Sequence, residues 1–199
     1  MGVKRLFDFT SSFIGFFILL PVFILIALVI KSTSKGPVFF RGIRVGRFGK
    51  QFRILKFRTM VPNAEELGGS STAGDDPRLT KIGKFLKKYQ LDELPQLINV
   101  IKGEMSLVGP RPEVPFYVNM MTEEEKKIIL SVRPGITDLA SLWDFHEGEI
   151  LKGSQDHEKT YMEKIRPEKI RLQIEYVKNR SFLLDLKIIF KTIIKAFYG

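Results

Sequence analysis

The 199-residue chain contains no cysteine, only one tryptophan and only two histidines. The absence of cysteine excludes disulfide bonds, cysteine-based zinc sites and a cysteine nucleophile. The two histidines, His146 and His157, lack a ligand spacing, which argues against a multi-histidine metal site. Disulfide-stapled and zinc-finger classes of protein are thus excluded.

Acidic residues are nearly absent from the first third of the chain. Residues 1–64 contain eleven lysines and arginines but a single acid, Asp8, whereas residues 65–199 contain 21 charges of each sign. The whole formal net charge of +10 therefore lies in the first third. A segment with this excess of positive charge attracts polyanions, namely nucleic acid, anionic lipid head groups or nucleotide phosphates.

An uncharged apolar segment covers residues 9–30, and at 22 residues it is long enough to cross a bilayer core of about 30 Å as a helix. Basic residues flank it on both sides: Lys4, Arg5, Lys31 and Lys35. The positive-inside rule draws both ends toward the cytoplasm. A helix that is broken at Pro21 and re-enters by the same face satisfies both features. A tilted single span with a proline kink is the alternative.

The 44% of hydrophobic residues argues against disorder, and the length suits one domain with an appendage. The predicted elements make up an α+β fold that is mostly helical. Residues 1–35 are predicted as a membrane-anchoring helix and residues 36–199 as a cytoplasmic domain. Residues 38–40 and 52–57 predict short strands around a glycine-rich basic turn at 44–50, which makes a small β-hairpin. That turn lacks a complete phosphate-binding motif.

Two later segments, residues 79–89 and 181–198, predict amphipathic helices with lysines opposite an apolar face. Each suits an interfacial helix on a membrane, and each equally suits a helix whose lysines face water above a protein core. Residues 62–77 predict a flexible loop, a candidate lid.

Asp92 and Glu93 directly precede a predicted helix, because Pro95 favours a first helical turn and apolar residues follow at helical spacing. Acids at this place cap a helix and interact favourably with its dipole. The functional alternative is a carboxylate nucleophile, or a Mg²⁺ ligand, beside a second carboxylate.

Three arginines stand directly before prolines: Arg111, Arg133 and Arg166. A residue before proline is pushed out of the α region, so we expect each arginine on a turn or loop. Guanidinium groups presented in this way suit diphosphates. The alternative is three helix boundaries with solvated arginines.

Six features occur in a fixed order along the chain. They are the apolar helix with Pro21, KFRTM at 56–60, LDELPQ at 91–96, KGEMSLVGPRP at 102–112, VRPGIT at 132–137 and YVKNRSFLLDLK at 176–187. Together they resemble the bacterial sugar transferase family, and in particular its small monotopic polyprenol-phosphate phosphoglycosyl transferases. The resemblance covers the chain from Lys4 to Tyr198.

The resemblance implies an enzyme that moves a phospho-sugar from a UDP-sugar to undecaprenyl phosphate and releases UMP, as the first membrane step of surface glycan assembly such as exopolysaccharide. It implies that Asp92 attacks the β-phosphate to form a covalent phospho-sugar intermediate. It assigns Glu93 to the same catalytic dyad, and either carboxylate to a Mg²⁺ ion. Basic residues are the candidates for binding the diphosphate: Lys56, Arg58, Arg111, Arg133 and Arg166.

The same resemblance implies a re-entrant helix at Pro21, with Lys4 and Arg5 at the membrane surface. The expected location is the bacterial inner membrane, with the catalytic domain facing the cytoplasm. The expected partners are the UDP-sugar, polyprenyl phosphate and anionic lipids, and no nucleic acid.

Two departures from the family pattern matter. Leu20 precedes Pro21, where relatives often have serine. Asp138 follows the VRPGIT motif, where many relatives continue with glycine and a glutamine-containing stretch. The first departure leaves a kinked span possible at Pro21. Because of the second, the identity of the sugar cannot be transferred from better-known members if this segment contacts the sugar.

Two rival hypotheses stay open. A non-enzymatic basic peripheral membrane protein that binds anionic lipid would keep its function in an Asp92→Asn variant. An enzyme in which Asp92 and Glu93 only ligate Mg²⁺, while the lipid phosphate attacks directly, would form no covalent intermediate.

Overall fold

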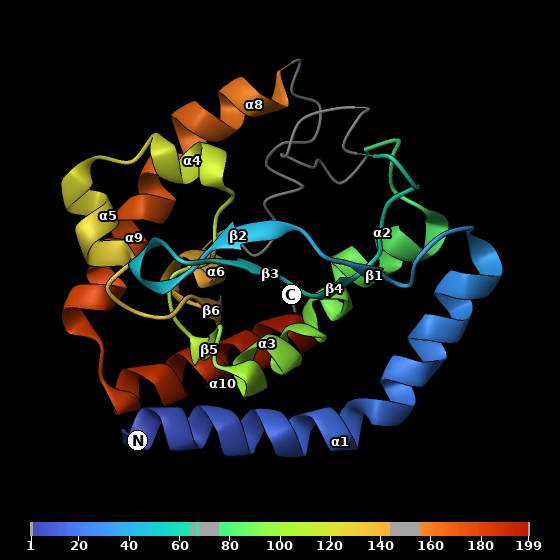
Figure 1. Ribbon diagram of the computed structural model, residues 1–199, viewed down its shortest axis with the longest axis horizontal. Helices are drawn as coiled ribbons and strands as arrows, with labels where there is room; N and C mark the ends of the chain where they lie inside the picture. Colours follow the sequence, from blue (N-terminus) through green and yellow to red (C-terminus); the bar gives the residue numbers. More distant parts are fainter. Residues whose placement is uncertain (1, 65–66, 68–75, 144–155, 199) are drawn as a thin grey trace.

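The computed structural model describes residues 2–64, 67, 76–143 and 156–198 (Figure 1). Its α-helices are α1 (Val3–Thr33), α2 (Lys81–Lys88), α3 (Gln96–Lys102), α4 (Pro115–Asn119), α5 (Glu123–Ile129), α6 (Leu139–Trp143), α8 (His157–Thr160), α9 (Arg166–Asn179) and α10 (Phe182–Tyr198). Its strands are β1 (Phe39–Phe40), β2 (Ile43–Val45), β3 (Gln51–Arg53), β4 (Lys56–Phe57), β5 (Ser106–Val108) and β6 (Gly135–Thr137). The predicted α+β, mostly helical class is confirmed.

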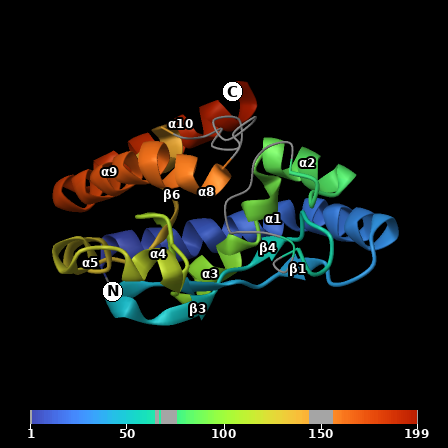
Figure 2. The same ribbon diagram turned by 90° about the horizontal axis from the view of Figure 1, so that it is seen from above.

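The elements form three layers in the view from above (Figure 2). The β2–β3 hairpin covers one side, α9 and α10 cover the opposite side, and α1, α3 and the β5–β6 pair lie between them. Most of the candidate lid at 62–77 falls on residues outside the described part of the chain.

Helix α1 does not break at Pro21, because the helix runs through this residue without interruption. Figure 1 shows instead that α1 bends and follows two edges of the molecule. A proline inside a helix removes one N–H donor and crowds the preceding turn, and a bend relieves that crowding while the helix continues. The predicted break therefore takes the form of a kink.

By length and composition, α1 is the one helix in the described residues that could cross a membrane. Only 17% of its most apolar 18-residue stretch is buried. A core helix of a soluble protein would be mostly buried, so the exposure of α1 favours contact with lipid.

Polar contacts tie the N-terminal end of α1 to the rest of the chain. Lys4 Nζ lies 2.6 Å from Asp185 Oδ2 in α10 and donates to the Val108 carbonyl of β5 at 3.1 Å. The buried carboxylate of Asp8 accepts from Ser106 Oγ at 2.6 Å. A buried charge is stable only when it is paired, so these contacts fix the start of the apolar helix.

Two arginines extend this attachment to both ends of α1. The Arg5 guanidinium donates to the Val100 carbonyl, near the end of α3, at 2.7 Å. At the other end, the buried Arg58 guanidinium binds the Lys35 carbonyl and both the carbonyl (3.1 Å) and the hydroxyl (2.7 Å) of Ser34. The last carbonyls of a helix lack intrahelical partners, and Arg58 satisfies those that follow α1.

The predicted pairing of 38–40 with 52–57 is present as the antiparallel pair β1–β4. A second antiparallel pair, β2–β3, lies within it, and β2 occupies part of the segment that was predicted as a turn. The strand predicted over 52–57 is divided in two, because the Leu55 N–H bonds the Asn99 side chain at 2.9 Å instead of a neighbouring strand. This division turns β4 toward the start of α3. It brings Lys56, the first residue of β4, to the Asp-Glu pair.

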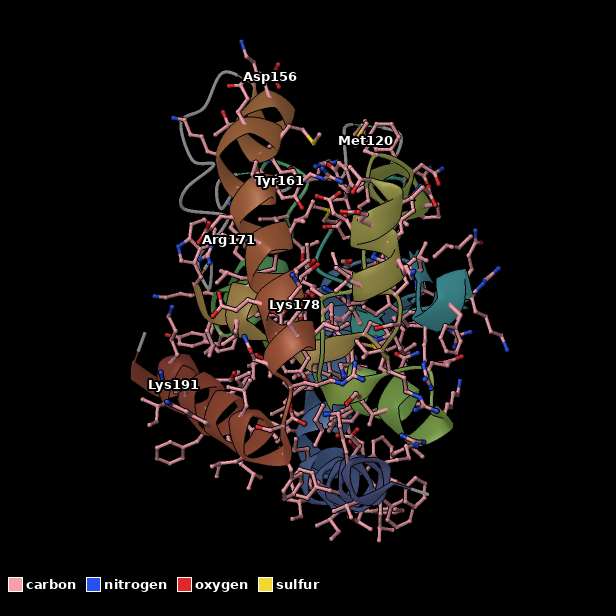
Figure 3. All side chains as sticks on the ribbon, turned by 90° about the vertical axis from the view of Figure 1, so that its left-hand side faces the viewer. Met120, Asp156, Tyr161, Arg171, Lys178 and Lys191 are labelled. Atoms are coloured by element: carbon pink, nitrogen blue, oxygen red, sulfur yellow. The ribbon has the colours of Figure 1, made fainter. Side chains whose placement is uncertain are left out.

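Both predicted amphipathic helices are present as α2 and α10, and each exposes large apolar side chains. They are Phe85 in α2 and Tyr89 directly after it, and Phe182, Leu183, Leu186, Phe190, Ile193 and Ile194 on α10. Figure 3 shows α10, marked by Lys191, on the same lower side of the molecule as α1. The rings of Phe7 and Phe182 join the two helices with centroids 5.2 Å apart. An exposed apolar patch of this extent favours the interfacial interpretation.

The expectation of a loop at Arg166 is wrong. The chain is helical from α8 through a π-helical turn, Tyr161–Ile165, into α9, and Arg166 is the first residue of α9. A π-turn widens the helix directly before Pro167, where a regular helix would place the proline ring against the preceding turn. The wider turn thus allows Arg166 to stay helical before a proline.

Candidate active site

The Asp-Glu pair lies at the start of α3, as predicted. Gln90 adopts a left-handed conformation (φ 53°), a single 3-10 turn follows over Leu91–Glu93, and Pro95 caps α3. The left-handed residue turns the chain sharply between α2 and α3, and a non-glycine residue in this region of conformation is typical of functional sites. Asp92 and Glu93 are buried by this turn.

The Glu93 carboxylate is held by two cations from different parts of the chain. Lys56 Nζ lies 2.7 Å from Glu93 Oε1, and Arg111 Nη1 lies 3.1 Å from Glu93 Oε2. Arg111 Nη2 also donates to Oε1, so the guanidinium forms a fork on the carboxylate. Burial raises the pKa of Glu93, but Arg111 and Lys56 outweigh burial and hold the pKa well below its usual range. Glu93 is therefore ionised at neutral pH.

Asp92 is in a different electrostatic state from its neighbour. Burial raises the pKa of Asp92 to about 6, and the charge of Glu93 acts in the same direction, against Lys56, Lys87 and Arg111. Within the described residues no side chain or backbone group donates a hydrogen bond to the Asp92 carboxylate. At pH 7 about nine-tenths of such a group is ionised. A desolvated anion without a donor is well suited to attack an electrophile.

Two of the five predicted substrate-binding residues, Lys56 and Arg111, are thus brought together with Asp92 and Glu93. The other three bind backbone carbonyls elsewhere. Arg58 binds the end of α1, Arg133 Nε donates to Gly103 at 2.8 Å, and Arg166 Nη2 donates to Tyr117 at 2.9 Å. Burial lowers the pKa of Arg58. Substrate binding by these three arginines stays a prediction.

Sequence reasoning missed Lys87, whose charge acts on Asp92, and Gln96, which stands four residues after Asp92 in the chain. Lys87, one of the lysines predicted to face either the membrane surface or water, is half-buried, and its charge acts on Asp92. Gln96 is almost fully buried one helical turn after Asp92, and its amide nitrogen has no hydrogen-bond partner in the described residues. The spacing of Gln96 from Asp92 along a predicted helix was the available signal. No local pattern separates Lys87 from its neighbouring lysines.

A third missed residue is Asp138, whose side chain is completely buried. It accepts hydrogen bonds from Ser141 and from the backbone of Arg111. Burial raises the pKa of Asp138, against the hydrogen bonds from Ser141 and the charges of Arg111 and Lys169. Its place directly after a motif was the only signal in the sequence.

The oxygen donors at this site suit Mg²⁺ only in part. No group of three or more acidic or histidine side chains that could hold a metal occurs among residues 2–64, 67, 76–143 and 156–198. Glu93 is already engaged by Lys56 and Arg111, whereas Asp92 has free lone pairs. Mg²⁺ is commonly bound by one or two carboxylates together with substrate phosphates and water. Asp92 with a diphosphate fits that pattern.

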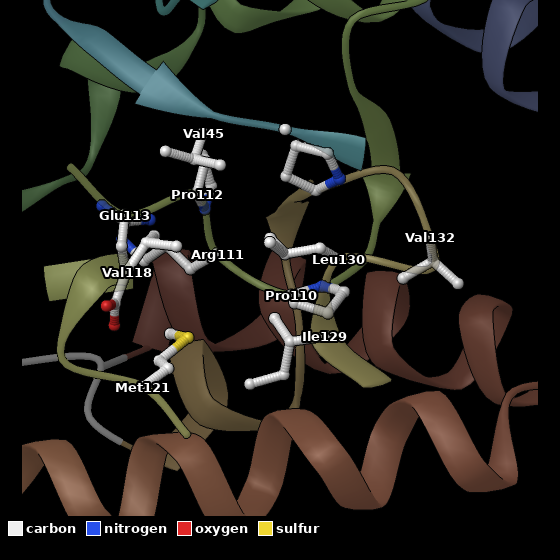
Figure 4. A pocket seen from close by; sticks show the side chains of 12 residues that line it. Val45, Pro110, Arg111, Pro112, Glu113, Val118, Met121, Ile129, Leu130 and Val132 are labelled. Carbon is white, nitrogen blue, oxygen red and sulfur yellow. The ribbon is translucent and has the colours of Figure 1, made fainter. Parts of the chain in front are cut away.

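A cavity of about 10 Å³ lies beneath the turn that carries Arg111 (Figure 4). Val45, Pro110, Val118 and Ile129 give it apolar walls. This volume holds one water molecule at most. The cavity is therefore a packing gap and too small for a sugar nucleotide.

The bacterial sugar transferase family matches residues 1–199. A UDP-N-acetylgalactosamine-undecaprenyl-phosphate N-acetylgalactosaminephosphotransferase of Aeromonas hydrophila is 38% identical over 96% of this chain and 43% of its own length. A UDP-glucose:undecaprenyl-phosphate glucose-1-phosphate transferase of Klebsiella pneumoniae is 37% identical over 99% of this chain and 40% of its own length.

The chain thus spans less than half the length of these two curated relatives. The uncharacterized sugar transferase EpsL of Bacillus subtilis (strain 168) is nearer in size, with 37% identity over 98% of this chain and 88% of its own. Because the family match runs from α1 through the Asp92–Glu93 pair to the last helix, the chain belongs to the bacterial sugar transferase family.

Proposed function

We propose that the chain transfers a phospho-sugar from a UDP-sugar to a polyprenyl phosphate such as undecaprenyl phosphate, in two steps through Asp92. The observation that carries this proposal is the contrast within the acid pair. Glu93 is fixed and ionised by two cations, whereas Asp92 is buried, has a raised pKa and lacks a hydrogen-bond donor among the described residues. Two acids that only capped α3 would not need such different pKa values and hydrogen-bond surroundings.

In the first step, an Asp92 carboxylate oxygen attacks the β-phosphorus of the UDP-sugar. The new bond joins that oxygen to phosphorus, the bond between the β-phosphorus and the bridging oxygen breaks, and UMP leaves with the electron pair. In the second step, a phosphate oxygen of the polyprenyl phosphate attacks the same phosphorus. The acyl phosphate bond breaks, Asp92 is regenerated and a polyprenyl diphosphate-linked sugar is released.

Lys56 and Arg111 have two duties in this scheme. They keep Glu93 ionised and immobile, and they place two positive charges beside the point at which an anionic nucleophile meets an anionic diphosphate. A Mg²⁺ ion, for which Asp92 offers the available carboxylate, would supply further neutralisation of the diphosphate charge.

The attachment of both ends of α1 supports a re-entrant helix. Lys4 and Arg5 bind β5, α10 and α3, while Arg58 binds the residues that follow α1. A helix that crossed the bilayer would separate its two ends by about 30 Å of hydrocarbon, and one domain on one side would not bind both. We place this domain on the cytoplasmic face of the bacterial inner membrane.

Lipid contact follows from the same arrangement. The exposed apolar side chains of α1 and α10 would enter the membrane, and the basic residues of the first third would meet anionic head groups. The lipid acceptor therefore reaches the active site from the bilayer, and nucleic acid has no part in the scheme.

A panel of UDP-sugars, scored by UMP release in the presence of undecaprenyl phosphate and Mg²⁺, tests the proposal. At least one donor should give turnover, and Asp92→Asn should abolish it. Glu124→Gln, on the exposed face of α5, is the matched control and should keep the parent rate. UMP release by the Asp92→Asn variant at the parent rate would contradict the role of Asp92. Absence of UMP release with every donor would favour a non-enzymatic lipid-binding protein.

A further inference from the structure

Arg111 is presented by a turn with very few backbone donors. In the segment GPRP at 109–112 both prolines lack an N–H, so only Gly109 and Arg111 can donate a backbone hydrogen bond. Gly109 N donates to the Thr137 carbonyl at 3.0 Å. Arg111 N donates to the Asp138 side chain, at Oδ2, over 3.2 Å. Both donors of this turn therefore bind the end of β6 and the residue after it.

The turn and β6 also approach each other very closely. A Cβ atom on Gly109 would lie 2.4 Å from the Arg133 carbonyl oxygen, and a Cβ atom on Gly135 would lie 2.1 Å from Gly109 N. Two glycines thus allow the backbones to meet, and Gly135 N donates to the Pro110 carbonyl at 3.0 Å. The backbone directly before Arg111 is consequently held in place at Gly109 and Pro110. At Arg111 itself, the contact is made by the Asp138 side chain.

The Asp138 carboxylate divides its two oxygens between separate tasks. Oδ1 accepts from Ser141 N at 2.7 Å and from Ser141 Oγ at 2.8 Å, which caps the N-terminus of α6. Oδ2 accepts from Arg111 N. A capping residue needs only one acceptor, so the second oxygen is available for Arg111.

We propose that Asp138 is a positioning residue for the transfer reaction, which fixes the backbone of Arg111 so that its guanidinium stays forked on Glu93. This inference rests on the proposed function of the Asp92–Glu93 pair. Loss of the Oδ2 contact would release the Arg111 N–H and allow the turn to shift, and a small displacement of a catalytic constellation lowers the rate strongly.

Three variants separate the two tasks of Asp138. Asp138→Ser keeps an N-cap residue for α6 but is too short to reach Arg111 N. Asp138→Asn keeps the size and the cap, because its single carbonyl oxygen stays on the two Ser141 donors, and its NH2 group then faces Arg111 N as a donor. Ser141→Ala is the matched control, because it removes one hydrogen bond of the cap and leaves Oδ2 untouched.

Hydrogen exchange of the full chain in detergent gives a readout that needs no substrate. The Arg111 amide should exchange about tenfold faster, or more, in Asp138→Ser and Asp138→Asn than in the parent and Ser141→Ala. Equal exchange in all four proteins would overturn the proposal. If the Arg111 amide of the parent protein exchanges slowly but the parent releases no UMP from any UDP-sugar, the proposed function is refuted, while the contact between Asp138 and Arg111 stands.

The rate of UMP release, with UDP-glucose and UDP-N-acetylgalactosamine as probes, should fall about tenfold or more in both Asp138 variants and stay within about twofold in Ser141→Ala. In an Arg111→Lys background, Asp138→Ser should lower the rate of UMP release by a factor at least about three times smaller than in the parent, because a lysine does not depend on the orientation of a planar guanidinium. An equal loss in both backgrounds would mean that Asp138 only caps α6, and would overturn the positioning role.

Discussion

The raised pKa of Asp92 predicts an acid limb in the first half-reaction. With a pKa of about 6, about nine-tenths of Asp92 is ionised at pH 7, half at pH 6 and about one-tenth at pH 5. Only the carboxylate attacks phosphorus, so the rate should fall about tenfold between pH 7 and pH 5. An aspartate with its ordinary pKa of about 3.9 would stay ionised over this range, and the rate would stay flat.

The assay is a single-turnover measurement of UMP release without lipid acceptor, because the acceptor phosphate itself titrates in this pH range. Burial is the main cause of the raised pKa, and the charge of Lys87 opposes it. Lys87→Met should therefore move the acid limb to higher pH. The neighbouring Lys88→Met, on the exposed side of α2, should leave the limb in place.

A flat profile from pH 5 to pH 7 would refute the electrostatic account of Asp92. A limb that shifts equally in Lys87→Met and Lys88→Met would show that the general charge of α2, and not the proximity of Lys87, sets the pKa of Asp92.

The remaining predictions concern stability and the pair of cations. Because the folded-state pKa of Asp92 is raised, the stability that its neutral form contributes is present at low pH and is lost as the pH rises through about 6. Asp92→Asn should therefore raise the thermal midpoint of unfolding at pH 7. An unchanged or lower midpoint would contradict the burial of an ionised group at this position. Arg58→Ala removes three hydrogen bonds from a buried guanidinium and should lower the free energy of unfolding by about 3 kcal/mol, measured by denaturation in detergent, whereas Arg41→Ala, at an exposed position, should have little effect. Lys56→Met leaves Glu93 with Arg111 alone and should lower the rate of UMP release by about a hundredfold with the fold retained; a rate near that of the parent would show that one cation suffices.

Much of the architecture could be predicted from local patterns in the sequence. The apolar run at residues 9–30, the periodicity of residues 79–89 and 181–198 and the position of Pro95 each indicated a helix that the structure contains. These features depend on the spacing of side chains along the chain, which is visible without tertiary structure.

The failures come from one tertiary contact and from two ways in which a helix accommodates a proline. The strand at 52–57 is divided because a distant asparagine binds Leu55, and Arg166 stays helical because a π-turn relieves the strain that Pro167 would cause. Neither the contact from Asn99 nor the π-turn can be recognised from the local sequence pattern. Similarly, Pro21 bends α1 where a break was expected.

The candidate site divides in the same way. Pro95 and the apolar spacing after it placed Asp92 and Glu93 at the start of α3, where the structure has them, and residue type alone suggested Lys56 and Arg111. The sequence did not show that Arg58 binds the end of α1, because that role depends on the path of the chain after residue 33. Asp138 was noted only as a departure from a motif, and its contact to Arg111 arises from the pairing of β5 with β6.

The intact mass of the protein tests the central claim most directly. After incubation with a UDP-sugar that supports turnover, without acceptor, the mass should rise by one phospho-sugar for each UMP released. Peptide mapping should place the addition on Asp92, and Asp92→Asn should stay unmodified. An unmodified mass in a preparation that turns over once undecaprenyl phosphate is added would contradict the two-step mechanism and favour direct attack by the lipid phosphate.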